Sequence, residues 1–291
     1  MGAELLDDDL ARAVSLDPRH VDLAAAREVT YVLRNDVAYD YPAPIRALHH
    51  RLVILPRLRH GDQLRLTHRL AVDAPSPTAV RGHCDWFGNP VVDIEAAEIP
   101  RRISFALRAV LHRTRDQIDG RPWCTTPSST TKLTAADDDL REVAATIDPR
   151  ARGERLATSI CHAVHDAMTY RHGETTVRTT AREAWQRRQG VCQDMAHIMI
   201  AMCRARGLPA RYVSGHLVGE GGSHAWVEVH DDRSERTAAL DPTHNRPTDL
   251  RYVTVAVGRD YRDVAPTAGH YRTGPHGTLS VNKAVAIANA R

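Results

Sequence analysis

The chain has 291 residues, of which 42% are hydrophobic and 26% are charged. This length predicts about two domains, and this composition excludes a wholly disordered chain. The formal net charge is only +3 and the charges are interspersed, so nucleic acid is not an expected partner. The longest apolar run, residues 198–203, is far shorter than the roughly 20 residues of a membrane-spanning helix.

Residues 1–26 are acidic and rich in Ala and Leu, and they predict a short helix followed by a loop at Asp17 and Pro18. A start without a basic segment is not typical of a secretory signal, so we expect a cytoplasmic protein. The five cysteines have irregular spacings and no Cys-x-x-Cys pair. In that compartment they are expected to be mostly free thiols.

Residues 27–115 form the first predicted domain and are rich in β-strand signals. The segments that alternate or favour strands are 30–33, 50–55, 64–72 and 103–111. Pro, Gly, Asn and Asp separate them, which predicts an antiparallel β-sandwich-like domain. Residues 116–138 are polar and are expected to be a linker or a surface loop.

Residues 139–291 form the second predicted domain, in which helices precede strands. Apolar residues four apart predict a helix over 153–170, and a capping box of Thr180 and Glu183 starts a short second helix. Residues 191–205 predict a third helix, apolar on nearly every side of its second half and therefore buried. Strands are expected at about 211–218, 224–230, 237–241 and 278–288.

Three residues of this domain have the right types and positions for nucleophilic catalysis. Cys192 lies at the predicted N-terminus of the buried helix, where unpaired N–H groups stabilise a thiolate. His224 opens a strand after a glycine-rich loop and can transfer a proton, and Asp241 ends the next strand and can orient the imidazole. Singly, each also fits a structural role: a core cysteine, one of 17 histidines, an Asp before Pro242. The order Cys, His, Asp on these elements is much more specific than its parts.

The segments around these residues resemble the bacterial transglutaminase-like superfamily, whose members share a papain-like core. They are GVCQDMAH at 190–197, GLPARYVSG at 207–215, SHAWVEV at 223–229, DPTHN at 241–245 and GRDYRDVAP at 258–266. The N-terminal half, with YPAP at 41–44 and DWFGN at 85–89, is similar to the β-domain that precedes this core in bacterial members. The resemblance covers residues 27–288 and leaves out 1–26. It implies an α+β fold, with helices packed on an antiparallel sheet after the β-domain.

The resemblance implies a nucleophile Cys192, a base His224 and an orienting acid Asp241, in an enzyme that forms a thioester. The first expectation is a cysteine peptidase or amidase acting on a peptide or an amide-containing small molecule. The alternatives are an amide-forming acyltransferase and a non-catalytic binding module on the same fold. Residues 236–240 lack the aromatic residue usual before the Asp in this family, which leaves the shape of the cleft wall open. The oligomeric state is also open.

The oxyanion hole has an obvious first donor, the backbone N–H of Cys192. For the second donor, Gln186 has a spacing similar to that in papain-like proteases, with Gln189 and Tyr170 as rivals; Gln186 also fits a plain surface position. The candidates for the substrate cleft are Trp226, Arg259, Asp260 and Tyr261. The last three of these fit a structural turn equally well.

Histidine clusters raise the possibility of a metal site. His162 and His165 lie three apart on one predicted helix beside Cys161, and further clusters stand at 49–50 and 83–85. Zinc sites need three or four ligands at tight spacings, and no further pair has a matching pattern. We therefore expect a histidine-rich surface and neither a metal nor a cofactor.

Overall fold

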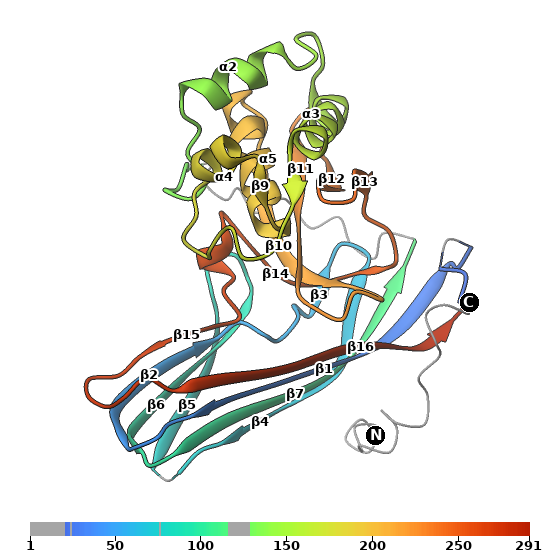
Figure 1. Cartoon of the computed structure of the whole chain (residues 1–291). Helices are drawn as coiled ribbons and strands as arrows, with labels where there is room; N and C mark the ends of the chain where they lie inside the picture. The colour runs from blue at the N-terminus through green and yellow to red at the C-terminus, as the bar shows by residue number, and fades with distance from the viewer. Residues whose placement is uncertain (1–20, 24, 76, 116–128) are drawn as a thin grey trace.

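The computed structural model describes residues 21–23, 25–75, 77–115 and 129–291. The helix predicted near the N-terminus and most of the predicted linker lie outside these residues. Within the described ranges, no helix combines the length and the apolar character needed to span a bilayer. Figure 1 shows two layers of long strands at one end of the molecule. At the other end, a group of helices lies against a separate sheet.

The first layer is a five-stranded antiparallel sheet built around β1 (Glu28–Asp40) and β7 (Arg102–Thr114). Its order is β16-β1-β7-β4-β3. The remaining strands are β3 (Arg59–His60), β4 (Gln63–Asp73) and β16 (Thr278–Ala290). Alternate residues of β7 from Ile103 to Leu111 are buried, as expected for a strand with one face on a core.

The second layer is a four-stranded sheet of order β15-β2-β6-β5. Its strands are β2 (Ile45–Leu52), β5 (Thr78–Cys84), β6 (Pro90–Ile99) and β15 (Thr267–His270). His50 of β2 stacks on Phe105 of β7 with 5.1 Å between ring centroids, and Ile94 joins the same apolar cluster. The two sheets therefore form the β-sandwich-like pair that the sequence predicts.

The last strands of the chain return to this sandwich. β16 pairs antiparallel with β1 along its whole length, and β15 pairs with β2. The sequence predicts the strand near 278–288 as part of the core at 139–291, whereas its hydrogen bonds place it in the first sheet. The physical reason is that β7 covers only one edge of β1, and an unpaired edge of 13 residues is best covered by another long strand. The boundaries between the domains stay a sequence prediction.

The helix-rich part is a five-stranded antiparallel sheet of order β13-β12-β11-β10-β14 with helices packed on it. The strands are β10 (Ala210–Leu217), β11 (His224–Asp231), β12 (Arg236–Asp241), β13 (Arg246–Pro247) and β14 (Tyr252–Gly258). The helices are α2 (Asp138–Thr146), α3 (Gly153–Ala167), α4 (Ala181–Arg187) and α5 (Cys192–Ala205). α5 packs on β10 and β11, and the other three helices pack on α5, as its apolar sequence predicts.

A short strand follows each of the helices α3 and α4. The sequence predicts a helix to residue 170, but α3 stops at Ala167 because β8 (Thr169–Tyr170) pairs in parallel with β9 (Gln189–Gly190). This pairing brings the end of α3 beside the segment that leads into α5. The capping box on α4 is present as predicted, since the Thr180 hydroxyl accepts from the N–H of Glu183.

Two side-chain amides join the sandwich to the edge of β14. Gln63 accepts from the N–H of Thr254 at 2.9 Å and donates to its carbonyl at 2.7 Å. Asn89 makes the same pair of bonds with Val257, at 2.9 and 2.7 Å. Both amides are buried, so they satisfy an edge that would otherwise lack partners.

Candidate active site

The candidate nucleophile stands at the first residue of α5. Val191 is the N-cap, and its N–H donates to Oδ2 of Asp194 at 2.8 Å, while the Thr175 hydroxyl donates to the same oxygen at 2.6 Å. A Cβ on Gly190 would lie only 2.7 Å from that oxygen. Asp194 thus fixes the turn that presents Cys192, and the sequence analysis missed this role. The signal available was an acidic residue at the third helical position, typical of a capping box.

His224 connects the candidate nucleophile to Asp241. Its Nε2 donates to Oδ2 of Asp241 at 2.7 Å, and Cys192 is among the groups that raise its pKa. Burial alone would lower the pKa of His224, but the hydrogen bonds and charges of these two partners outweigh burial and raise it to about 10. The structure thus brings together the three residues that the sequence proposes, and it favours a charged imidazole.

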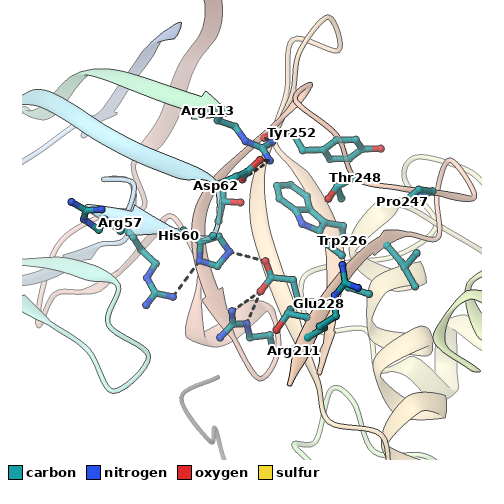
Figure 2. Close-up of a pocket in the computed structure, with 18 of the residues that line it drawn as sticks. Arg57, His60, Asp62, Arg113, Arg211, Trp226, Glu228, Pro247, Thr248 and Tyr252 are labelled. Atoms are coloured by element: carbon teal, nitrogen blue, oxygen red, sulfur yellow. Dashed lines mark hydrogen bonds and ion pairs between the residues drawn. The ribbon is translucent and has the colours of Figure 1, made fainter. Parts of the chain in front are cut away.

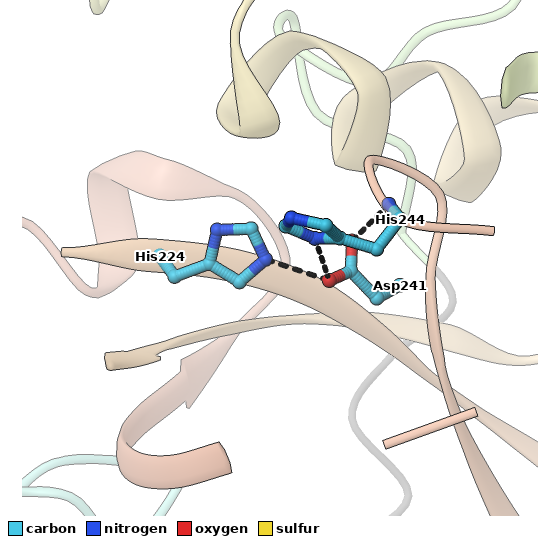
Figure 3. Close-up of side chains that lie close together, drawn as sticks. All are labelled: His224, Asp241 and His244. Carbon is cyan, nitrogen blue, oxygen red and sulfur yellow. Dashed lines mark hydrogen bonds and ion pairs between the residues drawn. The ribbon is translucent and has the colours of Figure 1, made fainter. Parts of the chain in front are cut away.

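Asp241 receives more donors than the sequence predicts (Figure 3). Its Oδ2 accepts from His224, from Nδ1 of His244 at 2.8 Å and from the Tyr252 hydroxyl at 2.7 Å, and its Oδ1 accepts from the N–H of Thr243 at 2.8 Å. Burial would raise the pKa of Asp241, but the bond and charge of His224, together with the other donors, hold it well below its usual range. His244 and Tyr252 were not among the sequence candidates, although His244 stands in the same DPTHN segment.

Potential metal ligands converge at the same place. Within the described ranges, ligand atoms of His224, Asp241 and His244 lie within 4.8 Å of one another. Both imidazoles already direct a nitrogen at one oxygen of Asp241, so hydrogen bonding accounts for the arrangement. His165, which the sequence analysis weighed as a ligand, instead directs Nδ1 at the carbonyls of Pro242 and Thr243. That no metal is required stays a prediction.

The three candidates for the second oxyanion donor differ in position. Tyr170 of β8 pairs with Gly190 and is 47% exposed. Its pKa is raised by burial and then by the charges of Cys192 and Glu220. Gln189 is half-buried on β9, and Gln186 is exposed on α4. The identity of the donor stays a proposal, and Tyr170 is the candidate with an electrostatic link to Cys192.

The segment of Arg259, Asp260 and Tyr261 forms a turn against α5. Arg259 pairs with Asp263 at 2.9 Å, and Asp260 caps the 3-10 helix η3 (Tyr261–Asp263). The Tyr261 N–H donates to Nε2 of His197 at 3.1 Å. Burial lowers the pKa of His197 to about 3, so its ring is neutral and can accept this bond. These contacts agree with a structural turn, and a role of the three residues in the substrate cleft stays a prediction.

A cavity of about 890 Å³ lies where the sandwich meets the β10–β14 sheet (Figure 2). Among its charged groups, Glu228 pairs with Arg211 at 2.6 Å and with His60 at 2.7 Å. Trp226, a sequence candidate for the cleft, and Tyr252 line it. Both rings also lie near His224, with centroids 6.3 and 6.0 Å from the imidazole. None of the three candidate catalytic residues lines the cavity. Trp226 therefore lies between this cavity and His224, on which its ring stacks.

Two family models match the chain. Residues 141–238 match the Transglutaminase-like superfamily, and residues 31–111 match the Bacterial transglutaminase-like N-terminal region. Uncharacterized proteins of Mycobacterium tuberculosis and Mycobacterium bovis are 37% identical over 147 residues, which is 45% of this chain and 47% of theirs. One from Mycobacterium leprae is 40% identical over 114 residues, 36% of this chain and 40% of that protein. The chain thus spans about half the length of the curated relatives it matches, or less.

A solved structure shows the same fold over both parts. The crystal structure described as "a Putative Cysteine Protease from Cytophaga hutchinsonii" superposes with a TM-score of 0.68 and 19% identity. The match covers 90% of this chain and 98% of that one. At this identity the likeness concerns the fold alone. With both family models and this fold, the chain belongs to the transglutaminase-like superfamily and carries the bacterial N-terminal region of that family before its core.

Proposed function

We propose that this protein is a cysteine-dependent acyl-transfer enzyme that cleaves amide or peptide bonds through a thioester on Cys192. The observation that supports this most is the hydrogen bond of 2.7 Å between His224 Nε2 and Asp241 Oδ2, on an imidazole whose pKa Cys192 also raises. His224 and Asp241 also have the protonation states that the chemistry needs. The pKa of His224 is raised to about 10 and that of Asp241 is lowered, so an imidazolium stands between a carboxylate and the sulfur.

In the proposed reaction, the Cys192 thiolate attacks the carbonyl carbon of the substrate. The start of α5 supplies the backbone N–H of Cys192 to the developing oxyanion, with Tyr170 proposed as the second donor. His224 then donates its proton to the leaving nitrogen, and Asp241 holds the ring in place and stabilises its charged form. Water, activated by the neutral imidazole, hydrolyses the thioester.

We propose hydrolysis as the main outcome, in line with the peptidase or amidase expected from the sequence. Three groups around the imidazole are partly exposed, Tyr170 on β8, Glu220 before β11 and His244 after β12, so water has access to a thioester here. Amide formation, with an amine as acceptor, is the alternative within enzymes. A non-catalytic module is disfavoured because all three residues of the candidate triad are present and His224 is bonded to Asp241. The substrate class, a peptide or an amide-containing small molecule, and the cytoplasmic location stay predictions.

Trapping the acyl-enzyme tests this proposal. The 291-residue chain is incubated with a peptide and metabolite pool, quenched in acid, and weighed intact and after digestion. We expect an added acyl mass on Cys192, and no such mass on Cys192→Ser at neutral pH. Cys84→Ser is the matched control, because Cys84 is an exposed thiol on β5 in the sandwich. Full hydrolytic activity in Cys192→Ala, or an adduct on another residue, would contradict the proposal.

A further inference from the structure

We propose that Glu220 stabilises the positive charge on the amine that leaves the substrate, so that this site selects amides over esters. The inference rests on the proposed function and deepens it, because it names the class of bond that the site is built to cleave.

Glu220 lies beside the nitrogen that transfers the proton. It stands in the turn between β10 and β11, in which Gly219 and Gly221 have positive φ. Its Oε2 lies 3.8 Å from Nδ1 of His224. Because Nε2 of that ring is bonded to Asp241, Nδ1 is the nitrogen left to face Cys192 and the substrate. The carboxylate therefore lies next to the path of the proton.

His244 fixes the position of this carboxylate. Its Nε2 lies 2.8 Å from Oε1 of Glu220, and its Nδ1 lies 2.8 Å from Oδ2 of Asp241. One imidazole thus bridges two carboxylates, and it can donate to both only when it carries two N–H groups. With Oε1 bound in this way, the other oxygen, Oε2, faces Nδ1 of His224, on the side where the substrate binds.

The turn that carries Glu220 is anchored at its far end. Nδ1 of His216 contacts the carbonyl of Gly222 at 3.0 Å. Burial lowers the pKa of His216 to about 4, so this ring is neutral and donates its Nδ1–H to the carbonyl. From the C-terminal strand, Lys283 donates to the Ser223 hydroxyl at 2.6 Å. A carboxylate on a turn held in this way is positioned before the substrate arrives.

The chemistry explains why an amide gains from this charge and an ester does not. When the thiolate adds to an amide and Nδ1 of His224 gives its proton to the nitrogen, that nitrogen becomes cationic while the oxygen is anionic. The carbon–nitrogen bond then breaks, its electron pair stays on nitrogen, and a neutral amine leaves a thioester and a neutral imidazole. The net charge of thiolate, imidazolium and substrate is zero throughout. The carboxylate of Glu220, 3.8 Å from the Nδ1 that delivers the proton, stabilises a cationic nitrogen formed there. An ester oxygen departs as a neutral alcohol and never carries a comparable charge.

Glu220→Gln separates this role from a structural one. The probes are the methylamide and the methyl ester of the acyl group trapped on Cys192. We expect kcat/KM for the methylamide to fall about tenfold or more, and that for the methyl ester to change by less than about twofold. The expected loss is below the 10²–10³-fold range of a buried oxyanion donor, because the Glu220 side chain is 44% exposed.

A matched control exists in the sandwich. Oε1 of Glu95 lies 3.8 Å from Nδ1 of His49, and the Glu95 side chain is 47% exposed, so Glu95→Gln removes a similar carboxylate away from the site. It should leave both probes unchanged. Equal losses on both probes in Glu220→Gln, or no loss on either, would overturn the role of Glu220 and leave the proposed function intact. A wild-type protein that cleaves neither probe would overturn the proposed function and this inference with it.

Discussion

One oxygen of Asp241 accepts hydrogen bonds from three side chains, those of His224, His244 and Tyr252. An orienting acid needs only the first of these. The other two keep the carboxylate in one position and ionised although it is fully buried, and burial without partners would favour the neutral form. The sequence could place Asp241 after a strand and before Pro242, but it could not reveal donors that come from the next turn and from β14.

Substitutions of Asp241 test whether orientation or charge matters more. Asp241→Asn keeps an acceptor for the imidazole, so it should retain more activity than Asp241→Ala. We expect the Ala variant to lose about 10²–10⁴ in kcat/KM, as when the third member of a triad is removed. The Ala variant also leaves the buried Tyr252 hydroxyl without its acceptor, at a cost of about 1–3 kcal/mol in unfolding free energy. Steady-state kinetics with circular dichroism as the folding control decides this. Wild-type activity in Asp241→Ala would remove Asp241 from the site.

Cysteine reactivity should separate Cys192 from the buried thiols. Burial raises the pKa of Cys161 and of Cys203 to about 12, so both stay protonated at neutral pH. Of the four cysteines in the described ranges, we expect limiting iodoacetamide to label Cys192 and the exposed Cys84, with activity falling only in proportion to Cys192. Peptide mapping by mass spectrometry measures this. Loss of activity with Cys192 unlabelled would show that another thiol does the chemistry.

The pair of His224 and Asp241 should also make stability depend on pH. The folded pKa of His224, about 10, lies above its unfolded value near 6.5. Its contribution is therefore fully present below pH 6.5 and is lost as the pH rises through 10. The pKa of Asp241 is lowered, so its contribution is present above about pH 3.9 and is lost on acidification. In urea titrations, the unfolding free energy of wild type should fall by at least about 1.4 kcal/mol more than that of Asp241→Asn between pH 6.5 and 10. If the unfolding free energies of the two proteins change with pH in the same way, the electrostatic coupling of His224 to Asp241 is contradicted.

At the scale of elements, local sequence signals predicted the helices and strands of the candidate site best. The capping box of α4, the start of α5 at Cys192 and the strands that carry His224 and Asp241 all agree with the sequence pattern. The errors come from pairing between distant segments. α3 ends early because β8 pairs with β9, and the partner of β16 is a strand some 250 residues earlier in the chain. Hydrophobic periodicity reports which face of a segment is buried, but not which segment covers its edge.

Gly190→Ala tests the turn into α5. The added Cβ would lie 2.7 Å from Oδ2 and 2.8 Å from Cβ of Asp194, whose carboxylate caps the helix. Overpacking of this kind costs about 1–3 kcal/mol, and a shift of Asp194 would also displace Cys192. We expect lower unfolding free energy and lower kcat/KM together. Gly82→Ala on β5 is the matched control, since its added Cβ meets nothing within 4 Å. An unchanged Gly190→Ala protein would show that this turn tolerates a side chain.

At the scale of the whole molecule, the chain crosses between the two parts more than once. Its first strands, from β1 on, build the sandwich, the next segments build the helices and the sheet of β10 to β14, and β15 and β16 return to the sandwich (Figure 1). Tyr31 of β1 donates to the carbonyl of Leu250, and the bonds of Gln63 and Asn89 to β14 run across the same junction. β14 pairs with β10, the strand before the turn that carries Glu220. The sandwich therefore supports the sheet on which the candidate site is built.

This junction predicts that both parts unfold in one transition. Asn89→Ala and Gln63→Ala each leave a buried N–H and a buried carbonyl of β14 without partners, and a buried unsatisfied group costs about 1–3 kcal/mol. We expect wild type to give coincident urea transitions by near-ultraviolet and far-ultraviolet circular dichroism, and the double variant to unfold at lower urea with the two signals separated. The matched control is Asn282→Ala, an exposed amide on β16, which should behave as wild type. A double variant that keeps the wild-type midpoint would mean that water replaces these amides at the edge of β14, and that the other contacts of the junction hold the two parts together.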